Sequence, residues 1–281
     1  MTTISILGAG ELGGAVAHAL ARRHGARRVL LVDAAPGPAA GKALDIQQSG
    51  PIEGFHAHLE GTNDASRIVG SAVCIVADRF GAPSAEWQGE DGLAYLARLA
   101  PYVGEAVVVF AGASQATLMA SAVREARYRR ERLVGSASEA FAAAVRAIVA
   151  MEARCSPSEV MLTVLGAAPG FVVVWGEASI GGYSLERVLT PVQVTRIEAR
   201  AARLWPPGPY ALGLAAALVA EAIVTSSRRA LTVLTVLDGE FGVRNRVGAV
   251  PALLAPHGIA HVRVPALSTR DRVLVETALD A

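Results

Sequence analysis

The chain has 281 residues, of which 52% are hydrophobic and 18% charged, so it can bury a large core in one domain or in two that share a core. Its formal net charge of +1 gives no electrostatic reason to expect a nucleic acid or an anionic membrane as partner. Binding to either would need a clustered excess of Lys and Arg. Cys74 and Cys155 lack the spacing of a metal-ligand pair, and the apolar run at 211–224 is too short to span a bilayer. We expect a cytoplasmic protein with no bound metal, no nucleic-acid partner and no membrane partner.

The N-terminal segment combines a predicted strand at 3–7, a glycine-rich turn and a helix that starts after Gly10. Gly8, Gly10 and Gly13 have the spacing of a dinucleotide fingerprint. The first glycine permits a tight turn, the second lets the backbone approach a pyrophosphate, and the third lets the helix pack closely on the strand. A second strand at 28–33 ends in Asp33, about twenty residues further on, where an acid can bind the hydroxyls of an adenosine ribose. This context predicts a dinucleotide site.

Strands and helices alternate through the rest of the first half. Further strands are predicted at 72–77 and 106–111, and further helices begin near Gly41, Asp91 and Gln115. Such alternation indicates an α/β fold with a doubly wound parallel sheet, in which ligands bind at the carboxyl ends of the strands. The loops that follow these strands should line one cleft. They begin after Leu7, Val32, Ala77 and Ala111.

The second half has a different pattern. A helix at 138–153 precedes two strands, at 160–164 and 171–175, which are joined by a short turn at 166–170. Helices at 190–204 and 211–226, a strand-rich stretch at 230–264 and a helix from Ser268 complete the chain. We predict a Rossmann domain over residues 1–133 and an α+β domain over residues 134–281, with no linker between them.

Sequence motifs along nearly the whole chain resemble one enzyme family, the lactate and malate dehydrogenases, in the lactate-dehydrogenase-like malate dehydrogenase branch. The motifs lie at 4–10, 31–33, 41–46, 51–55, 61–64, 150–152, 179–182, 237–242 and 250–259. The resemblance implies an NAD-binding Rossmann domain, a catalytic domain and a homo-oligomer, either dimer or tetramer. The expected cofactor-binding residues are Gly8, Gly10, Glu11, Leu12, Gly13, Asp33 and Ala77.

The catalytic positions that the resemblance implies do not hold the family's residues. Enzymes of the family reduce a 2-oxo acid by hydride transfer from NADH, with a histidine as general acid, an aspartate that orients it and arginines that bind the substrate carboxylate. The histidine belongs to the turn at 166–170, which contains none, and the aspartate falls at Phe141. The arginines fall at Ala144, Ser84 and Glu90. An asparagine that contacts the nicotinamide ribose falls at Gly112.

Three hypotheses follow from these observations. The first is a pseudoenzyme that binds NAD and has a regulatory or assembly role. The second is an NAD-dependent oxidoreductase for a malate-like, lactate-like or divergent hydroxy acid, with Arg79 as a substitute carboxylate ligand and Trp87 either stacking on a bound ring or anchoring its loop. The third is a structural subunit with a vestigial cofactor site. We assign core or surface roles to all six histidines, at positions 18, 24, 56, 58, 257 and 261.

Overall fold

The protein was analysed as a computed structural model that describes residues 2–23, 25–81 and 85–280. Within these residues, nine strands form one continuous sheet in the order β16-β15-β14-β8-β7-β4-β1-β2-β3. Six of them are parallel to one another. They are β1 (Thr3–Leu7), β2 (Arg28–Val32), β3 (His58–Thr62), β4 (Val73–Val76), β7 (Val107–Phe110) and β8 (Leu133–Gly135). The predicted α/β fold with a parallel sheet is confirmed.

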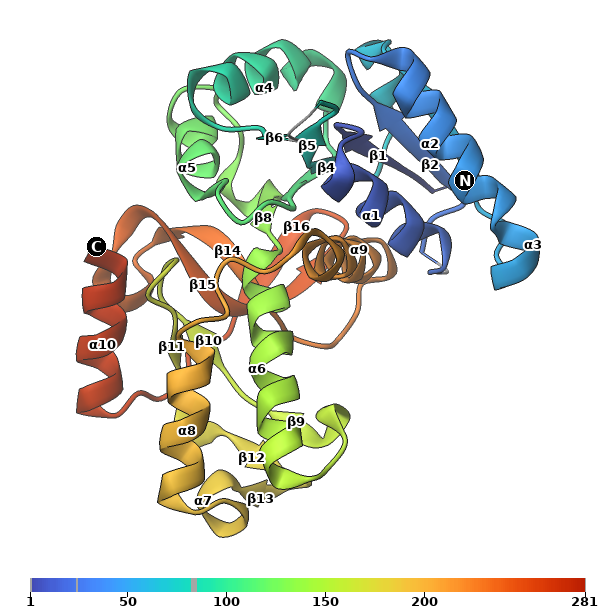
Figure 1. The fold of residues 1–281 in the computed structure, drawn as a ribbon. Coiled ribbons are helices and arrows are strands. Elements are labelled where there is room, and N and C mark those ends of the chain that lie inside the picture. Colours follow the sequence, from blue (N-terminus) through green and yellow to red (C-terminus); the bar gives the residue numbers. More distant parts are fainter. Residues whose placement is uncertain (1, 24, 82–84, 281) are drawn as a thin grey trace.

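Helices cover this parallel sheet and connect its strands (Figure 1). They are α1 (Glu11–Ala21), α2 (Pro36–Gln48), the short α3 (Gly50–Glu53), α4 (Gly89–Val103) and α5 (Ala116–Arg124). The predicted start of α2 near Gly41 is wrong, because the helix begins at Pro36. Proline is favoured in the first helical turn, where its fixed φ suits the helix and its missing N–H costs nothing.

The remaining strands of the large sheet are antiparallel. They are β14 (Leu231–Asp238), β15 (Arg244–Ala255) and β16 (Gly258–Val262), and β14 joins the parallel part through Leu234, paired with Gly135 of β8. The predicted domain boundary after residue 133 therefore falls inside β8, within the shared sheet. The strand β8 itself was not predicted, because its three residues carry no readable alternation.

Below the sheet, α6 (Ala137–Ala153) descends into a smaller unit, and α10 (Thr269–Asp280) lies at its side (Figure 1). The other elements here are β9 (Val160–Met161), β10 (Val164–Leu165), β11 (Val172–Val173), β12 (Ser179–Ile180), β13 (Tyr183–Ser184), α7 (Leu185–Val188) and α8 (Pro191–Ala201). The predicted strand at 160–164 is thus split into β9 and β10, which pair with different partners, β12 and β11. The predicted strand at 171–175 is shorter, because Trp175–Glu177 forms a 3-10 turn.

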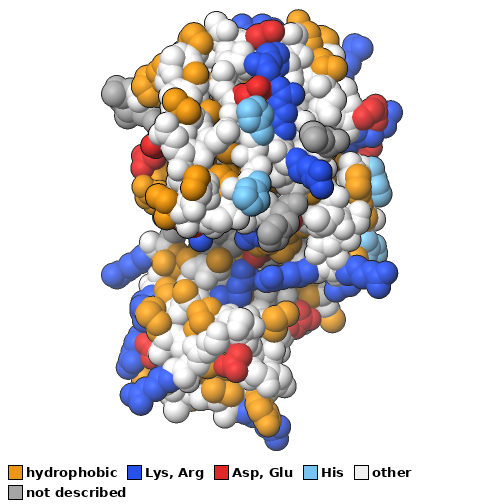
Figure 2. Space-filling model, turned by 90° about the vertical axis from the view of Figure 1, so that its right-hand side faces the viewer, with side chains coloured by type: hydrophobic (Ala, Val, Ile, Leu, Met, Phe, Trp, Pro, Cys, Tyr) orange, Lys and Arg blue, Asp and Glu red, His pale blue; other side chains and the backbone are white. Residues whose placement is uncertain are grey.

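The long apolar helix α9 (Pro209–Thr225) returns to the Rossmann part and packs on α1. Figure 2 shows the side of the molecule that lies to the right in Figure 1. On this face a narrowing separates the upper and lower parts, and Lys and Arg side chains form a band across it. No helix among the described residues is long and apolar enough to cross a bilayer.

Candidate functional site

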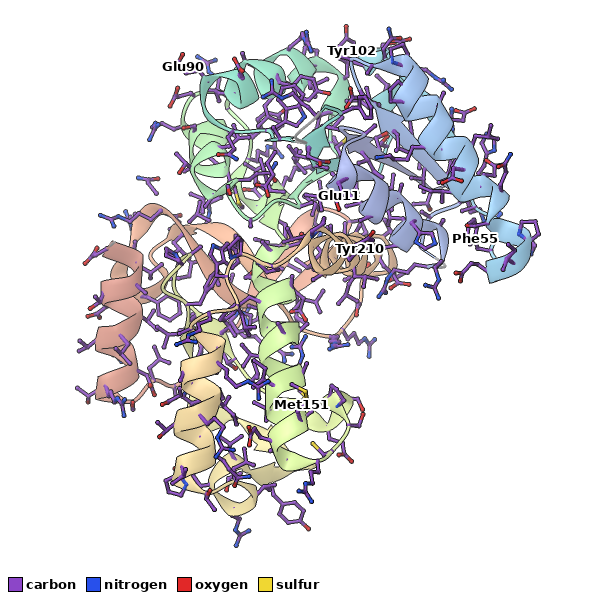
Figure 3. The ribbon with its side chains drawn as sticks, in the orientation of Figure 1. Glu11, Phe55, Glu90, Tyr102, Met151 and Tyr210 are labelled. Carbon is purple, nitrogen blue, oxygen red and sulfur yellow. The ribbon has the colours of Figure 1, made fainter. Side chains whose placement is uncertain are left out.

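The glycine-rich loop lies where the sequence predicts, between the end of β1 and the start of α1, at which Glu11 stands (Figure 3). Gly8 has a φ of 120°, which favours glycine, and its amide donates to Val32 O at 2.8 Å. The amide of Gly10 donates to the carbonyl oxygen of Asp78 at 3.1 Å. Asp78, which follows β4 and Ala77 in the chain, therefore contacts the glycine-rich loop directly.

The Asp78 carboxylate occupies the N-terminus of α1. Its oxygens accept hydrogen bonds from the amides of Leu12, at 3.0 Å, and Gly13, at 2.8 Å, and the residue is only 3% exposed. A helix N-terminus attracts anions through the backbone amides of its first turn, which have no partner within the helix, and through its positive dipole end. The anion present here is the protein's own. Any Cβ at Gly10 would collide with this carboxylate, so the second glycine of the fingerprint makes room for Asp78.

Two further effects act on Asp78. Burial raises the pKa of its carboxyl above the usual range, against the opposing influence of the two amides and of Lys42. The Lys42 ammonium reaches the same loop and donates to Ala9 O at 2.9 Å and to Gly10 O at 2.5 Å. The loop is therefore held from both sides by charged side chains of this chain.

Asp33 lies at the end of β2, as predicted, but its carboxylate is engaged by the protein. One oxygen accepts from Ala9 N at 2.8 Å and Phe80 N at 2.9 Å, and the other accepts from Ala35 N at 3.0 Å. The residue is 7% exposed. Through these three hydrogen bonds the Asp33 carboxylate connects neighbouring loops, and the hydroxyls of a ribose would have to compete with the three amides for it.

A second carboxylate fills the next loop of the cleft, between β7 and α5. Glu86 accepts from Ala113 N at 3.0 Å and from Ser114 N at 2.8 Å. Gln115, which is 1% exposed, accepts from Gly112 N at 2.8 Å through its side-chain oxygen. A Cβ at Gly112 would collide with the Glu86 carboxylate. Glycine at position 112, where the resemblance expects asparagine, therefore leaves the space that the Glu86 carboxylate occupies.

One pocket at this end of the sheet is small and has acidic residues in its lining. A pocket of about 210 Å³ remains between α1, the loop before α5 and the start of α9, and Glu11, Asp78 and Glu86 contribute carboxylates to its lining. Small-molecule sites usually measure about 300–1,000 Å³. A pyrophosphate placed at the N-terminus of α1 would displace Asp78 and meet its like charge. In this arrangement the described residues do not fit a dinucleotide.

The sequence reasoning missed Asp78 and Glu86. Their only local signal is an acid directly after the buried strand β4 and another a few residues later. The carbonyl oxygen of Ala77, which was predicted to contact the cofactor, accepts a hydrogen bond from the Gln115 amide nitrogen at 3.1 Å.

Phe141, at the position that the resemblance assigns to the aspartate, belongs to an aromatic cluster next to the turn at 166–170. Phe141 on α6 is 4% exposed, and its ring centroid lies 5.1 Å from that of Phe171 and 6.4 Å from that of Trp205. Phe171 and Trp205 meet edge to face at 4.9 Å. Such arrangements are typical of hydrophobic packing. The Phe141 ring cannot accept a proton as the aspartate would, and the turn at 166–170 supplies no histidine.

A wide pocket of about 800 Å³ opens beside this cluster, between α8 and α10, and includes Pro169 and Gly170 of the histidine-free turn. Ala144, where the resemblance expects an arginine that binds the substrate carboxylate, is half-buried. Arg146, two residues further along α6, bonds the buried Glu139 at 2.5 Å. The nearest arginine of this helix is therefore committed to a structural ion pair.

Arg79 and Trp87, the two residues near the loop after β4 that the sequence analysis singled out, contact each other. The Arg79 guanidinium lies 4.9 Å from the centre of the Trp87 ring and 3.6 Å from the Asp91 carboxylate. Trp87 stacks on Tyr95 of α4 with ring centroids 4.0 Å apart. These contacts make Trp87 a loop anchor. Glu90 is exposed in the first turn of α4, and Ser84 lies outside the described residues.

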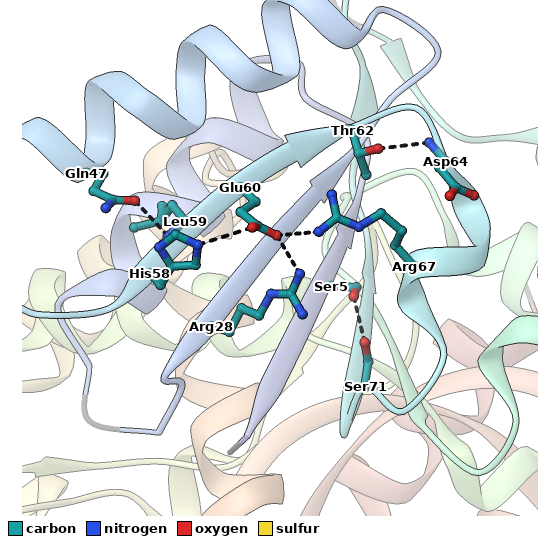
Figure 4. A network of polar contacts seen from close by, with 10 residues as sticks. All are labelled: Ser5, Arg28, Gln47, His58, Leu59, Glu60, Thr62, Asp64, Arg67 and Ser71. Carbon is teal, nitrogen blue, oxygen red and sulfur yellow. Dashed lines mark hydrogen bonds and ion pairs between the residues drawn. The ribbon is translucent and has the colours of Figure 1, made fainter.

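The described histidines lie away from both pockets. His18 is on α1, His56 and His58 are at β3, and His257 and His261 are at β16, whereas His24 lies outside the described residues. His58 contacts Glu60 at 3.2 Å within a network at the sheet edge that also includes Arg28 and Arg67 (Figure 4).

Among the described residues, the thiols and acids do not cluster as metal ligands would. Burial raises the pKa of the Cys74 thiol to about 12, which makes it unreactive. Across residues 2–23, 25–81 and 85–280, no group of three or more His, Cys, Asp or Glu side chains could hold a metal ion.

Comparison with known proteins gives a consistent result. No family model matches the chain. It is 29% identical to a malate dehydrogenase of Roseiflexus sp. over 99% of its own length and 95% of the relative's, and 28% identical to one from Cytophaga hutchinsonii over 98% and 94%. Its fold matches the solved malate dehydrogenase from Salinibacter ruber with a TM-score of 0.87 at 24% identity, over 99% of this chain and 94% of that one. A lactate dehydrogenase from Cryptosporidium parvum, solved with lactic acid and NAD, matches with a TM-score of 0.87 at 22% identity, over 99% and 95%.

Proposed function

We propose that this chain, whose similarity to malate dehydrogenases along almost its entire length supports membership of the lactate/malate dehydrogenase family, is a pseudoenzyme of that family. In our proposal it keeps the fold, does not reduce 2-oxo acids, and acts as a structural, regulatory or assembly subunit in a reducing cytoplasm. The observation that carries this proposal is the aromatic cluster of Phe141, Phe171 and Trp205 at the reaction centre.

The chemistry explains why this cluster matters. Hydride arrival at a carbonyl carbon creates an alkoxide that must receive a proton, and loss of a general acid typically costs about 10²–10⁴ in rate. The turn at 166–170 contains no histidine, Phe141 stands where the resemblance places its aspartate partner, and Ala144 cannot bind a carboxylate. The acids Glu11, Asp78 and Glu86 would also repel an anionic substrate in the remaining pocket.

A turnover assay tests the proposal. The protein and the malate dehydrogenase from Salinibacter ruber would be incubated under the same conditions with NADH and oxaloacetate, pyruvate or other 2-oxo acids, and NADH loss followed by absorbance. We expect the control to turn over and this protein to remain at the background rate. Robust turnover with any substrate would refute the proposal and support the oxidoreductase hypothesis, and an Arg79→Ala variant would then test the predicted carboxylate ligand.

We also propose that the protein is a homo-oligomer, dimer or tetramer. Tyr210, near the start of helix α9 (Figure 3), is 75% exposed, and Leu214 on the same helix is 54% exposed. Residues four apart lie on the same face of a helix, so these two side chains form an apolar strip. Leu44 of α2 is also exposed, at 58%. Large exposed apolar side chains grouped in this way are typical of protein interfaces.

A further inference from the structure

Asp78 and Glu86 stand opposite each other on one small hairpin, formed by β5 (Asp78–Arg79) and β6 (Ala85–Glu86). Directly opposed residues of an antiparallel pair project from the same face. Each carboxylate nevertheless binds a different loop of the cleft. Asp78 takes the amides of Leu12 and Gly13, and Glu86 takes those of Ala113 and Ser114.

The position of the hairpin in the sheet explains this reach. It continues from β4, which lies between β1 and β7 in the sheet. The loops after β1 and β7 therefore flank it on either side, and both present free backbone amides at the carboxyl edge of the sheet. This edge is where doubly wound sheets bind their ligands. A third contact, from Phe80 N to Asp33, adds the loop after β2.

The base of the hairpin is fixed by several contacts. Trp87 N donates to Ala77 O at 3.3 Å, and the Gln115 amide nitrogen bonds both Ala77 O and Trp87 O, at 3.1 and 3.4 Å. Stacking of Trp87 on Tyr95 attaches the same end to α4. Space for the carboxylates comes from Gly10 and Gly112, where any Cβ would collide with Asp78 and Glu86 respectively. The contacts at the base hold the hairpin in place, and the two glycines leave room for its two carboxylates to reach the loops.

We propose that Asp78 and Glu86 are internal ligands of the former dinucleotide site. Asp78 takes the place of a phosphate at the N-terminus of α1, and Glu86 satisfies the loop that would face the nicotinamide ribose. The wild-type protein therefore does not bind NAD or other diphosphates there. This inference goes beyond the proposed function, because a protein unable to reduce 2-oxo acids could still bind NAD tightly.

The test is a binding titration by calorimetry with two probes, NADH and inorganic pyrophosphate. We expect no saturable binding to the wild type at millimolar probe. In Asp78→Ala the amides of Leu12 and Gly13 become free, so we expect pyrophosphate to bind at least tenfold more tightly than to the wild type. Asp64→Ala is the matched control, because Asp64 is also a carboxylate that accepts from a backbone amide, that of Ser66 at 2.9 Å, but at a different loop. It should behave as the wild type.

Two results would overturn the inference. One is micromolar binding of NADH or pyrophosphate by the wild type, and the other is a folded Asp78→Ala protein that binds pyrophosphate no better than the wild type. If Asp78→Ala does not fold, the wild type decides by itself through its amide NMR spectrum. The signals of Leu12 and Gly13 should then stay in place when pyrophosphate is added, and a saturable shift of either would contradict the proposal. Turnover plays no part in these readouts, so this inference and the proposed function can fail separately.

Discussion

Truncation of Phe141 tests whether this ring, at the position where the resemblance places the catalytic aspartate, is a tightly packed part of the hydrophobic core. The ring is 4% exposed and contacts two other aromatic rings, at 5.1 and 6.4 Å between centroids. Phe-to-Ala changes in cores typically cost about 3–5 kcal/mol, and an aromatic pair contributes about 0.5–1.5 kcal/mol of this. The neighbouring pocket of about 800 Å³ allows side chains and water to relax into the vacated space. We therefore expect Phe141→Ala to lower the free energy of unfolding by about 3 kcal/mol, the lower end of that range.

The assay is equilibrium unfolding in urea, followed by fluorescence and circular dichroism. With a slope of about 3 kcal/mol per molar urea, the midpoint should fall by about 1 M. Met151→Ala is the control on the same helix, because Met151 is 59% exposed (Figure 3) and should cost about 0.5 kcal/mol or less. A cost below about 1 kcal/mol for Phe141→Ala would refute the reasoning, since it would mean that the ring lines an adaptable ligand site and is not tightly packed.

Three further predictions concern charge and assembly. The raised pKa of Asp78 means that the folded state binds this proton more tightly than the unfolded state, so the associated stability is full below the usual pKa of the group and is lost as pH rises through the folded value. Unfolding free energies of wild type and Asp78→Asn, measured between pH 3 and about pH 7, should therefore differ by an amount that changes with pH, and parallel profiles would contradict this. The bond from Arg28, together with His58 and Arg67, lowers the pKa of Glu60 from 4.5 to about 2, so its stabilisation is present above pH 4.5 and is lost as pH falls toward 2. Glu60→Gln should cost about 1 kcal/mol at neutral pH and flatten the acid-unfolding curve over that interval, and an unchanged curve would count against the network. Tyr210→Ala combined with Leu214→Arg should convert the oligomer into monomers by light scattering, whereas a monomeric wild type would disprove the proposed assembly.

The sequence predicted the parallel half of the fold well, because its signals are local. Buried strands such as 28–33 read as short apolar runs, and the helix after Gly10 follows a glycine-rich turn whose spacing has a known structural meaning. Boundaries were less accurate where short-range rules compete. Gly41 suggested a late helix start, whereas Pro36 determines it.

The sequence could not predict in the same way that carboxylates of this chain bind the amides of the candidate site. The bond from Gly13 to Asp78 joins residues 65 positions apart, and no periodicity records such a pair. The glycines at positions 8, 10 and 13 satisfy the fingerprint equally well whether a phosphate or a carboxylate faces them. Likewise, the replacement at Phe141 was visible in the sequence, but its contacts with Phe171 and Trp205 depend on how α6 packs against distant segments.

The departures from the family pattern in the two halves of the proposed pseudoenzyme are physically connected. A dehydrogenase of this kind holds two anionic partners, a diphosphate and a carboxylate, and therefore needs free amides and arginines on the two sides of one cleft. Here the amides are taken by Asp78 and Glu86, and the cationic positions hold Ala144 and Glu90. An internal acid at the N-terminus of α1 is tolerable only if no phosphate has to bind there. Such an acid also makes a substrate carboxylate less favourable nearby, so the acids at Asp78 and Glu86 and the lack of arginine at positions 144 and 90 act in the same direction.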